Sequence, residues 1–473
     1  MNSDFSELTH SFKIIQVKKL TSLLITMKYE KWSLGYWTLK QYVRFVDWII
    51  VNKTIVIGKD NIPKDKPVLF APNHQNALSD PMAILLNTKF QPVWLARADI
   101  FKNKTVILIL RFMKIMPVYR IRDGKENLAN NDKTFADSIK VLESNGALAL
   151  FPEASHTGKR QMVSHKKAVP RIVFMAEEKA GHNLDIQIIP TGIYYSNYWK
   201  MNRNLVVNFG EPISVNNYLS EYKENQNSAI LSLRDKISDS VQPLVVNFKT
   251  KNYYTDFEKI REIYGSHFLK RQNKKMSISN LFKSDHILAN KLDNLETEKP
   301  EEIDKLIKNV NNYSKIIKKL KIRNWLIENP KNNIFRIAIN KLILIAGLPI
   351  FVFGFLLNAI PFFISDTIIR TKIKDRAFWS SFSLAMGIIL FPILYLLQFF
   401  ALSWIIPGIW LKAVFLISMP FAGKIAFKWY ILFRKTVGRA RYFILNFFRK
   451  PEYNNLLKTK ENLFQSLDHL ISI

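Results

Sequence analysis

Between about residues 53 and 215, short apolar runs alternate with stretches whose apolar residues recur at helical spacing. The helical stretches cover about residues 81–88, 101–114, 133–144 and 167–180. The apolar runs, which we expect to be strands, read TIVIG, PVLFAP, PVWLA, MPVYR, ALALFP, IQIIPTGIYY and LVVNFG. This alternation predicts an α/β domain at residues 53–215, with a mostly parallel central sheet flanked by helices.

The segment before this domain, residues 1–52, contains one clear helical pattern, WSLGYWTLKQYVRFVDWIIV at residues 32–51. Lys40, Arg44 and Asp47 fall on one stripe of that helix, and apolar side chains fill a wide face. Tryptophans flanked by basic residues are typical of an amphipathic helix that lies at a membrane interface. The same pattern fits a helix packed against its own domain, so both interpretations stay open.

The extreme N-terminus lacks a basic region followed by an apolar run and a small-residue cleavage site, so we expect no signal peptide. Residues 1–26 have no clear pattern, and Met27 is an alternative first residue. After the α/β domain, residues 216–332 are polar, charged and helix-prone. We expect a charged helical insert or linker there, with several helices folding back onto the domain.

Residues 333–433 form a region that we expect to be embedded in a membrane. Its three apolar segments cover about residues 342–364, 383–405 and 407–433, and the second of them carries no charge. About 20 apolar residues suffice to span the hydrocarbon core of a bilayer. The remaining residues, 434–473, are predicted to form a basic amphipathic tail.

Basic residues set the expected topology of this region. The connection at residues 404–411 has none, whereas clusters follow the first and third apolar segments: Arg370, Lys372, Lys374 and Arg376, then Arg434, Lys435, Arg439 and Arg441. By the positive-inside rule we expect both clusters to lie on the cytoplasmic face and residues 404–411 on the far side. If the basic α/β domain is also cytoplasmic, as we expect, residues 342–364 must return to the side from which they start. We therefore expect a re-entrant or interfacial segment at 342–364, bent near Pro349, followed by a two-helix hairpin. The alternative is three simple spans.

The charge of the chain implies an anionic partner. The 473 residues include 69 Lys and Arg against 38 Asp and Glu, a formal net charge of +31. Anionic membrane lipids and nucleic acid both fit that charge, but the long apolar segments favour the membrane, and no nucleic-acid-binding motif accompanies them. The absence of cysteine excludes a disulfide framework, a Cys-based zinc site and a cysteine nucleophile.

The stretch NHQNALSDP at residues 73–81 is the first candidate for chemistry. Asp80 precedes Pro81 and an apolar helix, which predicts that Asp80 is the N-cap of that helix. His74 follows a strand, at the carboxyl edge where parallel sheets place their sites. An aspartate close to His74 would fix the imidazole tautomer and make the other ring nitrogen more basic, as a general base requires.

A second stretch, GALALFPEASHTGKR at residues 146–160, also leads from a strand into a loop. Its polar side chains are Glu153, His156, Lys159 and Arg160, and Arg120 ends the strand MPVYR. These groups bring cations to the strand ends, where the planar fork of an arginine suits a phosphate monoester. Glu153 either holds a polyol hydroxyl or pairs with Arg120.

The order NHQNALSDP, MPVYR, FPEASHTGKR, IIPTGIYY and VVNFGEPI resembles the conserved blocks of the glycerolipid acyltransferase superfamily, which contains lysophosphatidic acid and glycerol-3-phosphate acyltransferases. The resemblance covers about residues 35–215. It implies that His74 is the general base, that Asp80 orients it, and that Arg120 and Glu153 bind glycerol phosphate.

Two departures point to one branch of this superfamily. Five residues, rather than the usual four, separate His74 from Asp80, and Ala154-Ser155-His156 replaces the Gly-Thr-Arg that usually follows the glutamate. Lys159 and Arg160 are the candidates to replace the missing phosphate-binding arginine. Both departures resemble the fungal-type glycerol-3-phosphate or dihydroxyacetone-phosphate acyltransferases and related bacterial proteins, which also carry a C-terminal membrane hairpin.

The resemblance implies a membrane-bound O-acyltransferase of phospholipid biosynthesis. It would move a fatty acyl group from acyl-CoA or acyl-ACP to a hydroxyl of glycerol-3-phosphate or 1-acylglycerol-3-phosphate. We expect no cofactor and no metal, because His156, His165 and His182 lack further ligands at metal-binding spacing. The alternative is a non-catalytic membrane protein that binds anionic lipid through a degenerate acyltransferase domain.

Overall fold

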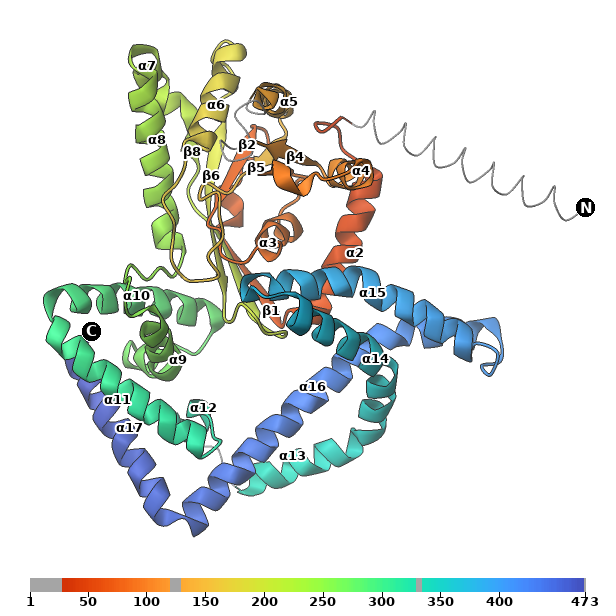
Figure 1. The fold of residues 1–473 in the computed structure, drawn as a ribbon, viewed down its shortest axis with the longest axis vertical. Coiled ribbons are helices and arrows are strands. Elements are labelled where there is room, and N and C mark those ends of the chain that lie inside the picture. Colours follow the sequence, from red (N-terminus) through yellow and green to blue (C-terminus); the bar gives the residue numbers. More distant parts are fainter. Residues whose placement is uncertain (1–27, 120–128, 329–333, 472–473) are drawn as a thin grey trace, which may run out of the picture.

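The computed structural model describes residues 28–119, 129–328 and 334–471, and its centre is one eight-stranded sheet (Figure 1). The strands are β1 (Lys53–Ile57), β2 (Val68–Pro72), β3 (Val93–Arg97), β4 (Ile115–Val118), β5 (Ala147–Ala149), β6 (Gln187–Tyr195), β7 (Asn204–Phe209) and β8 (Ile213–Ser214). Their order is β1-β7-β6-β2-β5-β3-β4, with β8 beside β6.

Most strand pairs in this sheet are parallel, which confirms the predicted α/β fold. Among the strands that the structure describes, the antiparallel pairs are β6 with β7 and β6 with β8. The connection from β6 to β7 is too short for the crossover that a parallel pair requires, so the chain returns as a hairpin. Strand β2, which leads into the His74 stretch, lies between β6 and β5 and is fully buried.

Helices cover both faces of the sheet, as the alternation of patterns predicts. One face packs against α5 (Asn130–Glu143), α6 (Ala168–Lys179) and α8 (Gln226–Val241), and the other against α2 (Leu34–Ile50) and α3 (Ser79–Asn87). The short helices α4 (Lys104–Phe112) and α7 (Leu219–Glu224) complete this part of the chain. The buried side chains of both faces are mostly Val, Ile, Leu and Phe, which accounts for the continuous apolar runs in the sequence.

Helix α2 packs against its own domain through its polar stripe. The buried Lys40 ammonium donates to the carbonyl groups of Thr88 and Phe90, and Arg44 donates to that of Leu86. These carbonyls lie at or just past the carboxyl end of α3, where helical carbonyls lack intrahelical partners and cations can satisfy them. The tryptophans stay outside: Trp37 and Trp48 are 46% and 48% exposed. The helix thus combines a packed face with an exposed aromatic one.

The charged segment after the sheet forms a second helical layer. Its helices are α9 (Tyr254–Arg271), α10 (Ile278–Glu298), α11 (Pro300–Lys319) and α12 (Asn324–Glu328). They share one hydrophobic core with side chains of β6 and β7 and with α17 (Lys450–Leu470) near the end of the chain. The apolar face of the predicted basic tail is therefore buried against this layer.

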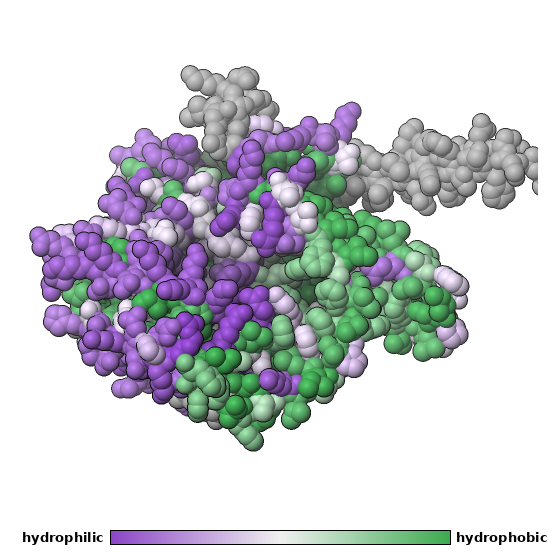
Figure 2. Space-filling view, turned by 60° about the horizontal axis from the view of Figure 1, so that its bottom comes forward, coloured by the Kyte–Doolittle hydropathy of each residue, from purple (hydrophilic) through white to green (hydrophobic). Residues whose placement is uncertain are grey.

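The apolar part of the chain consists of α13 (Ile334–Ala346), α14 (Leu348–Lys372), α15 (Trp379–Leu402) and α16 (Ile409–Phe448). The last three are long and apolar enough to cross a membrane. Figure 2 shows hydrophobic residues gathered on one side of the molecule and hydrophilic ones on the other. This distribution indicates membrane association, and the side of the membrane on which the domain lies stays a prediction.

The break between α13 and α14 lies at Gly347, two residues before Pro349, where the sequence predicts a bend, and α14 continues as one helix through Pro361. A proline in the first turn of a helix costs no hydrogen bond, which explains why Pro349 does not break α14. In addition, α16 runs unbroken through the expected boundary after residue 433.

Candidate active site

The loop between β2 and α3, residues 73–78, and the first turn of α3 bring His74 and Asp80 together. His74 Nδ1 lies 2.9 Å from Asp80 Oδ2, as it would when Nδ1–H donates to the carboxylate. The Asp80 side chain is 1% exposed and that of His74 is 15% exposed. With Nδ1 bound to Asp80, Nε2 is the ring nitrogen left for proton transfer.

Asp80 is not the N-cap of α3, so that expectation is wrong. The helix begins at Ser79, which places Asp80 inside its first turn. Its Oδ2 atom accepts hydrogen bonds from the backbone N–H groups of Gln75 (2.8 Å) and Asn76 (2.7 Å). Ala77 has a left-handed backbone, with φ of +37°, in the turn that follows these amides. The carboxylate therefore organises the loop in front of the helix rather than the helix end itself.

Aromatic rings form one wall beside His74. The imidazole stacks on Phe151, with ring centroids 3.9 Å apart and planes at 20°. His156 meets it edge-on at 5.4 Å and 85°. Burial, followed by the charge of His74, lowers the pKa of His156. His156 is therefore uncharged at neutral pH and offers His74 a polar but neutral neighbour.

Glu153 joins the two loops of the site. Its Oε1 accepts the backbone N–H of His74 (3.1 Å) and its Oε2 accepts that of Val163 (3.2 Å). The residue is 1% exposed, and burial raises its pKa to about 8 although both N–H groups act in the opposite direction. Arg120, its other expected partner, lies outside the described residues. The contacts of Glu153 are those of a residue that fixes backbone positions.

The predicted phosphate-binding cations do not gather as expected. Arg160 is buried, its guanidinium donates to Glu258 (2.9 Å) and to the carbonyl of Tyr195, and it lies over the Tyr198 ring. Lys159 is exposed and lies over the ring of Tyr254, 5.2 Å from its centroid. Arg160 thus has other partners, because the helical layer after the sheet supplies the carboxylate of Glu258.

Sequence reasoning missed Arg97, which ends β3 at the same carboxyl edge of the sheet. It pairs in register with Val118 of β4, forms an ion pair with Asp99, and its charge acts to lower the pKa of His156. Its place at the end of the run PVWLAR was the signal that could have revealed it. Among the residues that the structure describes, no three His, Asp or Glu side chains gather to hold a metal.

Sequence reasoning also missed the turn before α15 and the first residues of that helix. Ser380 and Ser381 hydrogen-bond to residues of the His74 loop and the start of α3, and the Phe378 ring meets His156 edge-on at 4.6 Å. These residues are about 300 positions from His74 and carry no motif of their own. Only the folded chain reveals the contact.

Comparison with known proteins agrees with this geometry. Residues 53–194 match the family model described as Acyltransferase. The chain is 24% identical to the 1-acyl-sn-glycerol-3-phosphate acyltransferase of Borreliella burgdorferi over 221 residues, which are 45% of this chain and 81% of the relative. It is also 24% identical to the glycerol-3-phosphate O-acyltransferase 2 of Saccharomyces cerevisiae over 136 residues, which are 28% of this chain but only 18% of the relative.

Among solved structures, the 1-acyl-sn-glycerophosphate (LPA) acyltransferase PlsC from Thermotoga maritima matches 49% of this chain and 94% of its own, with 16% identity and a TM-score of 0.31. That score is too low for the likeness to carry weight. The family model thus assigns an acyltransferase domain to residues 53–194, which hold His74, Asp80 and Glu153, and both relatives are named as acyltransferases of glycerol phosphates.

Proposed function

We propose that this chain is a membrane-bound O-acyltransferase that moves a fatty acyl group from acyl-CoA or acyl-ACP to a hydroxyl of glycerol-3-phosphate or 1-acylglycerol-3-phosphate. The observation that carries the proposal is the contact of 2.9 Å between His74 and the buried Asp80 at the carboxyl edge of the sheet. The names of the two relatives support a glycerol phosphate acceptor.

The proposed reaction needs only one base and one positioning carboxylate. His74 Nε2 removes the proton of the acceptor hydroxyl while the oxygen attacks the thioester carbonyl. The tetrahedral intermediate collapses, the C–S bond breaks, and the leaving thiolate takes the proton back from His74. Asp80 holds Nδ1–H and stabilises the imidazolium that forms between these steps. The chain has no cysteine and no Gly-x-Ser-x-Gly sequence, so we expect direct transfer without an acyl-enzyme.

The acceptor phosphate requires cations at the same edge. We assign this role to Arg120, Lys159 and Arg97, with His156 as a neutral hydrogen-bonding group. Arg160 and Glu153 instead support the loops, because both terminal nitrogens of Arg160 and both carboxylate oxygens of Glu153 already have protein partners. Binding the non-reacting phosphate would position the hydroxyl and so raise the rate of transfer.

The apolar helices fit a reaction whose product stays in the bilayer. The basic cluster at Arg370, Lys372, Lys374 and Arg376 lies in the last turn of α14 and in the connection to α15, and all four side chains are exposed. Such clusters attract anionic lipids at about 1 kcal/mol per cation near the surface. We place the acyltransferase domain on the cytoplasmic face, since positive residues prefer that side.

The experiment that tests this function offers three acceptors and two donors to the purified full chain in lipid vesicles. The acceptors are glycerol-3-phosphate, 1-acylglycerol-3-phosphate and dihydroxyacetone phosphate, and the donors are radiolabelled acyl-CoA and acyl-ACP. We expect labelled product with at least one pair. If no pair gives product while the chain binds anionic vesicles, the function is that of a non-catalytic lipid-binding protein instead.

A further inference from the structure

The first turn of α15 lies directly on the loop that carries His74. Ser381 Oγ accepts the backbone N–H of Leu78 at 2.9 Å. Ser380 Oγ donates to the side-chain carbonyl of Asn76 and lies 3.2 Å from Ser79 Oγ. Both serines are nearly buried, at 7% and 5% exposed. An apolar candidate membrane helix therefore makes polar contacts at the centre of the acyltransferase domain.

The residues that Ser380 and Ser381 contact also hold Asp80 next to His74. Asn76 supplies one of the two N–H groups that hold Asp80, and Leu78 is the N-cap of α3 but has no capping side chain of its own. Ala77, between them, has the left-handed backbone. The Ser381 hydroxyl accepts the N–H of the N-cap residue Leu78, as the third helical residue does in a capping box, and Ser380 donates to the Asn76 side chain. Without these hydroxyls, the loop would lose both partners on that side.

The turn before α15 contacts the second loop of the site. Phe378 meets the His156 ring, which in turn meets His74. A Cβ at Gly158 would lie 2.9 Å from Cη2 of Trp199 and 3.1 Å from the Ala377 Cβ, so the turn packs closely on this loop. The Gly158 N–H donates to the carbonyl of Gln75 at 3.1 Å, so the two loops and the turn are in mutual contact.

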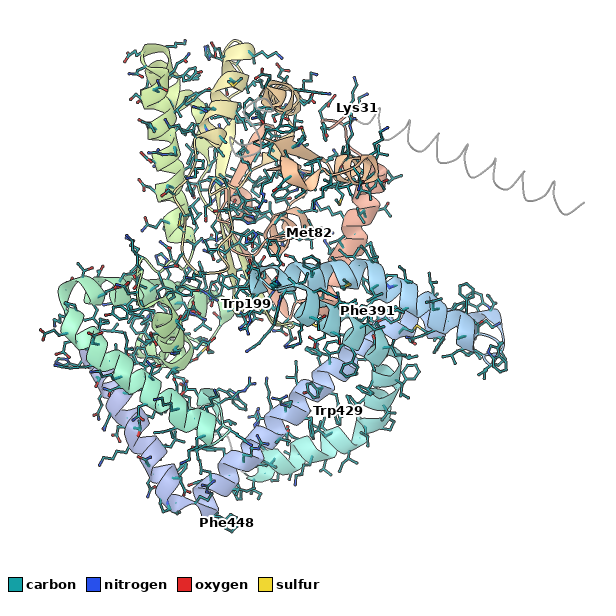
Figure 3. The ribbon with its side chains drawn as sticks, viewed as in Figure 1. Lys31, Met82, Trp199, Phe391, Trp429 and Phe448 are labelled. Carbon is teal, nitrogen blue, oxygen red and sulfur yellow. The ribbon has the colours of Figure 1, made fainter. Side chains whose placement is uncertain are left out.

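Helix α15 is itself held against the domain. The Tyr42 hydroxyl of α2 donates to the carbonyl of Ile388, and Leu384 packs with Val46 and Ile50. Figure 3 shows Met82 of α3 and Trp199 on the side of the domain that faces the start of α15, and Met82 belongs to the same cluster. These contacts hold the first turn of α15 in place against the His74 loop.

We propose that Ser380 and Ser381 are positioning residues for the acyl transfer, holding the His74 loop in the conformation that keeps Asp80 on His74. The expected effect on kcat rests on the proposed function, whereas the expected effect on the conformation of the His74 loop does not. A hydroxyl both donates and accepts, so serine or threonine can serve at these positions and alanine cannot. Through these two residues, the apolar helix becomes part of the site.

The test compares the full-length wild type with Ser380→Ala/Ser381→Ala, with Ser380→Thr/Ser381→Thr, and with Ser383→Ala as a control. Ser383 belongs to the same helix but bonds only within it, to the carbonyl of Trp379. Two quantities are measured in vesicles of one lipid composition: hydrogen exchange of a peptide covering residues 73–80, and the kcat and acceptor KM of acyl transfer. Thermal unfolding is recorded for each variant.

We expect the double alanine variant to exchange the loop amides roughly tenfold faster. Its kcat should fall about tenfold or more, with the acceptor KM within about twofold of wild type, because misplacement of a base affects the chemical step more than binding. The threonine variant should recover both properties, and Ser383→Ala should match wild type. The melting temperature should stay close to that of wild type in all variants.

Unchanged exchange and unchanged kcat in the double alanine variant would overturn the proposal. The proposal would also be overturned if the double alanine variant lost kcat together with a lower melting temperature and the double threonine variant did not recover kcat. The serines would then contribute to stability alone. If the wild type transfers no acyl group but the double alanine variant still exchanges the loop amides faster, the loop contact is established and the proposed function is contradicted instead.

Discussion

At the scale of single residues, the Asp80 side chain is held in place by hydrogen bonds and burial. One oxygen accepts from His74 and from two backbone N–H groups, and the side chain is 1% exposed. We expect Asp80→Asn to lower kcat about 100-fold or more, because an amide can present its NH₂ group to the imidazole and select the wrong tautomer. Kinetic assay of the variant checks this, with Asp60→Asn at an exposed position as the control. Wild-type kcat in Asp80→Asn would contradict the role of Asp80.

Glu153 makes stability depend on pH. Burial raises its pKa from the ordinary value near 4.5 to about 8, so the native chain keeps a proton that the unfolded chain releases. The stability that neutral Glu153 contributes is therefore fully present below about pH 4.5 and is lost as the pH rises through about 8, at up to about 1.4 kcal/mol per pH unit.

Unfolding of wild type and Glu153→Gln between about pH 5 and pH 9 checks this expectation, because glutamine cannot ionise. Wild type should lose stability relative to the variant as the pH rises. Glu211→Gln, at an exposed position, should leave the pH dependence as it is. Parallel curves for wild type and Glu153→Gln would show that Glu153 is already ionised in the folded chain.

The sequence predicts that Asp80 lies close to His74, and the structure places the two side chains 2.9 Å apart. The predicted local structure of Asp80, an N-cap, is wrong. Asp80 before Pro81 predicts an N-cap, whereas α3 begins at Ser79, and a distant serine, Ser381, accepts the N–H of its N-cap residue Leu78. The sequence suggests Arg160 for phosphate binding, but its partner Glu258 lies about 100 residues further along the chain. Tertiary contacts of this kind are contained in no local pattern.

At the scale of elements, the crossing of α14 and α16 depends on a small residue. A Cβ at Gly354 would lie 2.3 Å from the carbonyl oxygen of Ala422, so only glycine allows this approach. Asn358, one turn further, donates to the carbonyl of Met419 on α16 and accepts from the Tyr395 hydroxyl on α15. The three helices thus meet around one amide.

We expect Gly354→Leu to separate α14 from α16 and to destabilise the helical region by about 1–3 kcal/mol, the usual cost of forcing extra atoms into a packed contact. Thermal unfolding in detergent measures the change. Val352→Leu, which places the same leucine side chain on an exposed face of α14, is the control. Equal melting temperatures for the two variants would contradict the close crossing.

Most strands and helices of the domain were predictable, because the residues that are buried on one face of a strand or helix recur in the sequence with a period of 2 or 3.6. The end of α16 was not, since a change from apolar to basic residues marks a change of environment and not the end of a helix. The burial of α17 against α11 was equally hidden, because amphipathicity shows that a face needs a partner but not which partner.

At the scale of the whole molecule, hydrophobic residues gather on one side of the surface and hydrophilic residues on the other (Figure 2). Because the chain has no cysteine, a single introduced thiol reports its own accessibility. We expect Lys372→Cys, in the basic cluster, to react with an impermeant reagent applied from the cytoplasmic side. Ile409→Cys, in the basic-free connection and 73% exposed, should react only from the opposite side. The reverse pattern would contradict the predicted topology.

The central claim is that His74, held by Asp80, is the base for acyl transfer. Its most direct test is the rate of transfer by His74→Ala with the best acceptor and donor, against wild type and against His469→Ala, an exposed histidine far along the chain. We predict a fall in kcat of about 100-fold to 10,000-fold for His74→Ala with unchanged folding, and no change for His469→Ala. A His74→Ala variant as active as wild type would contradict the account.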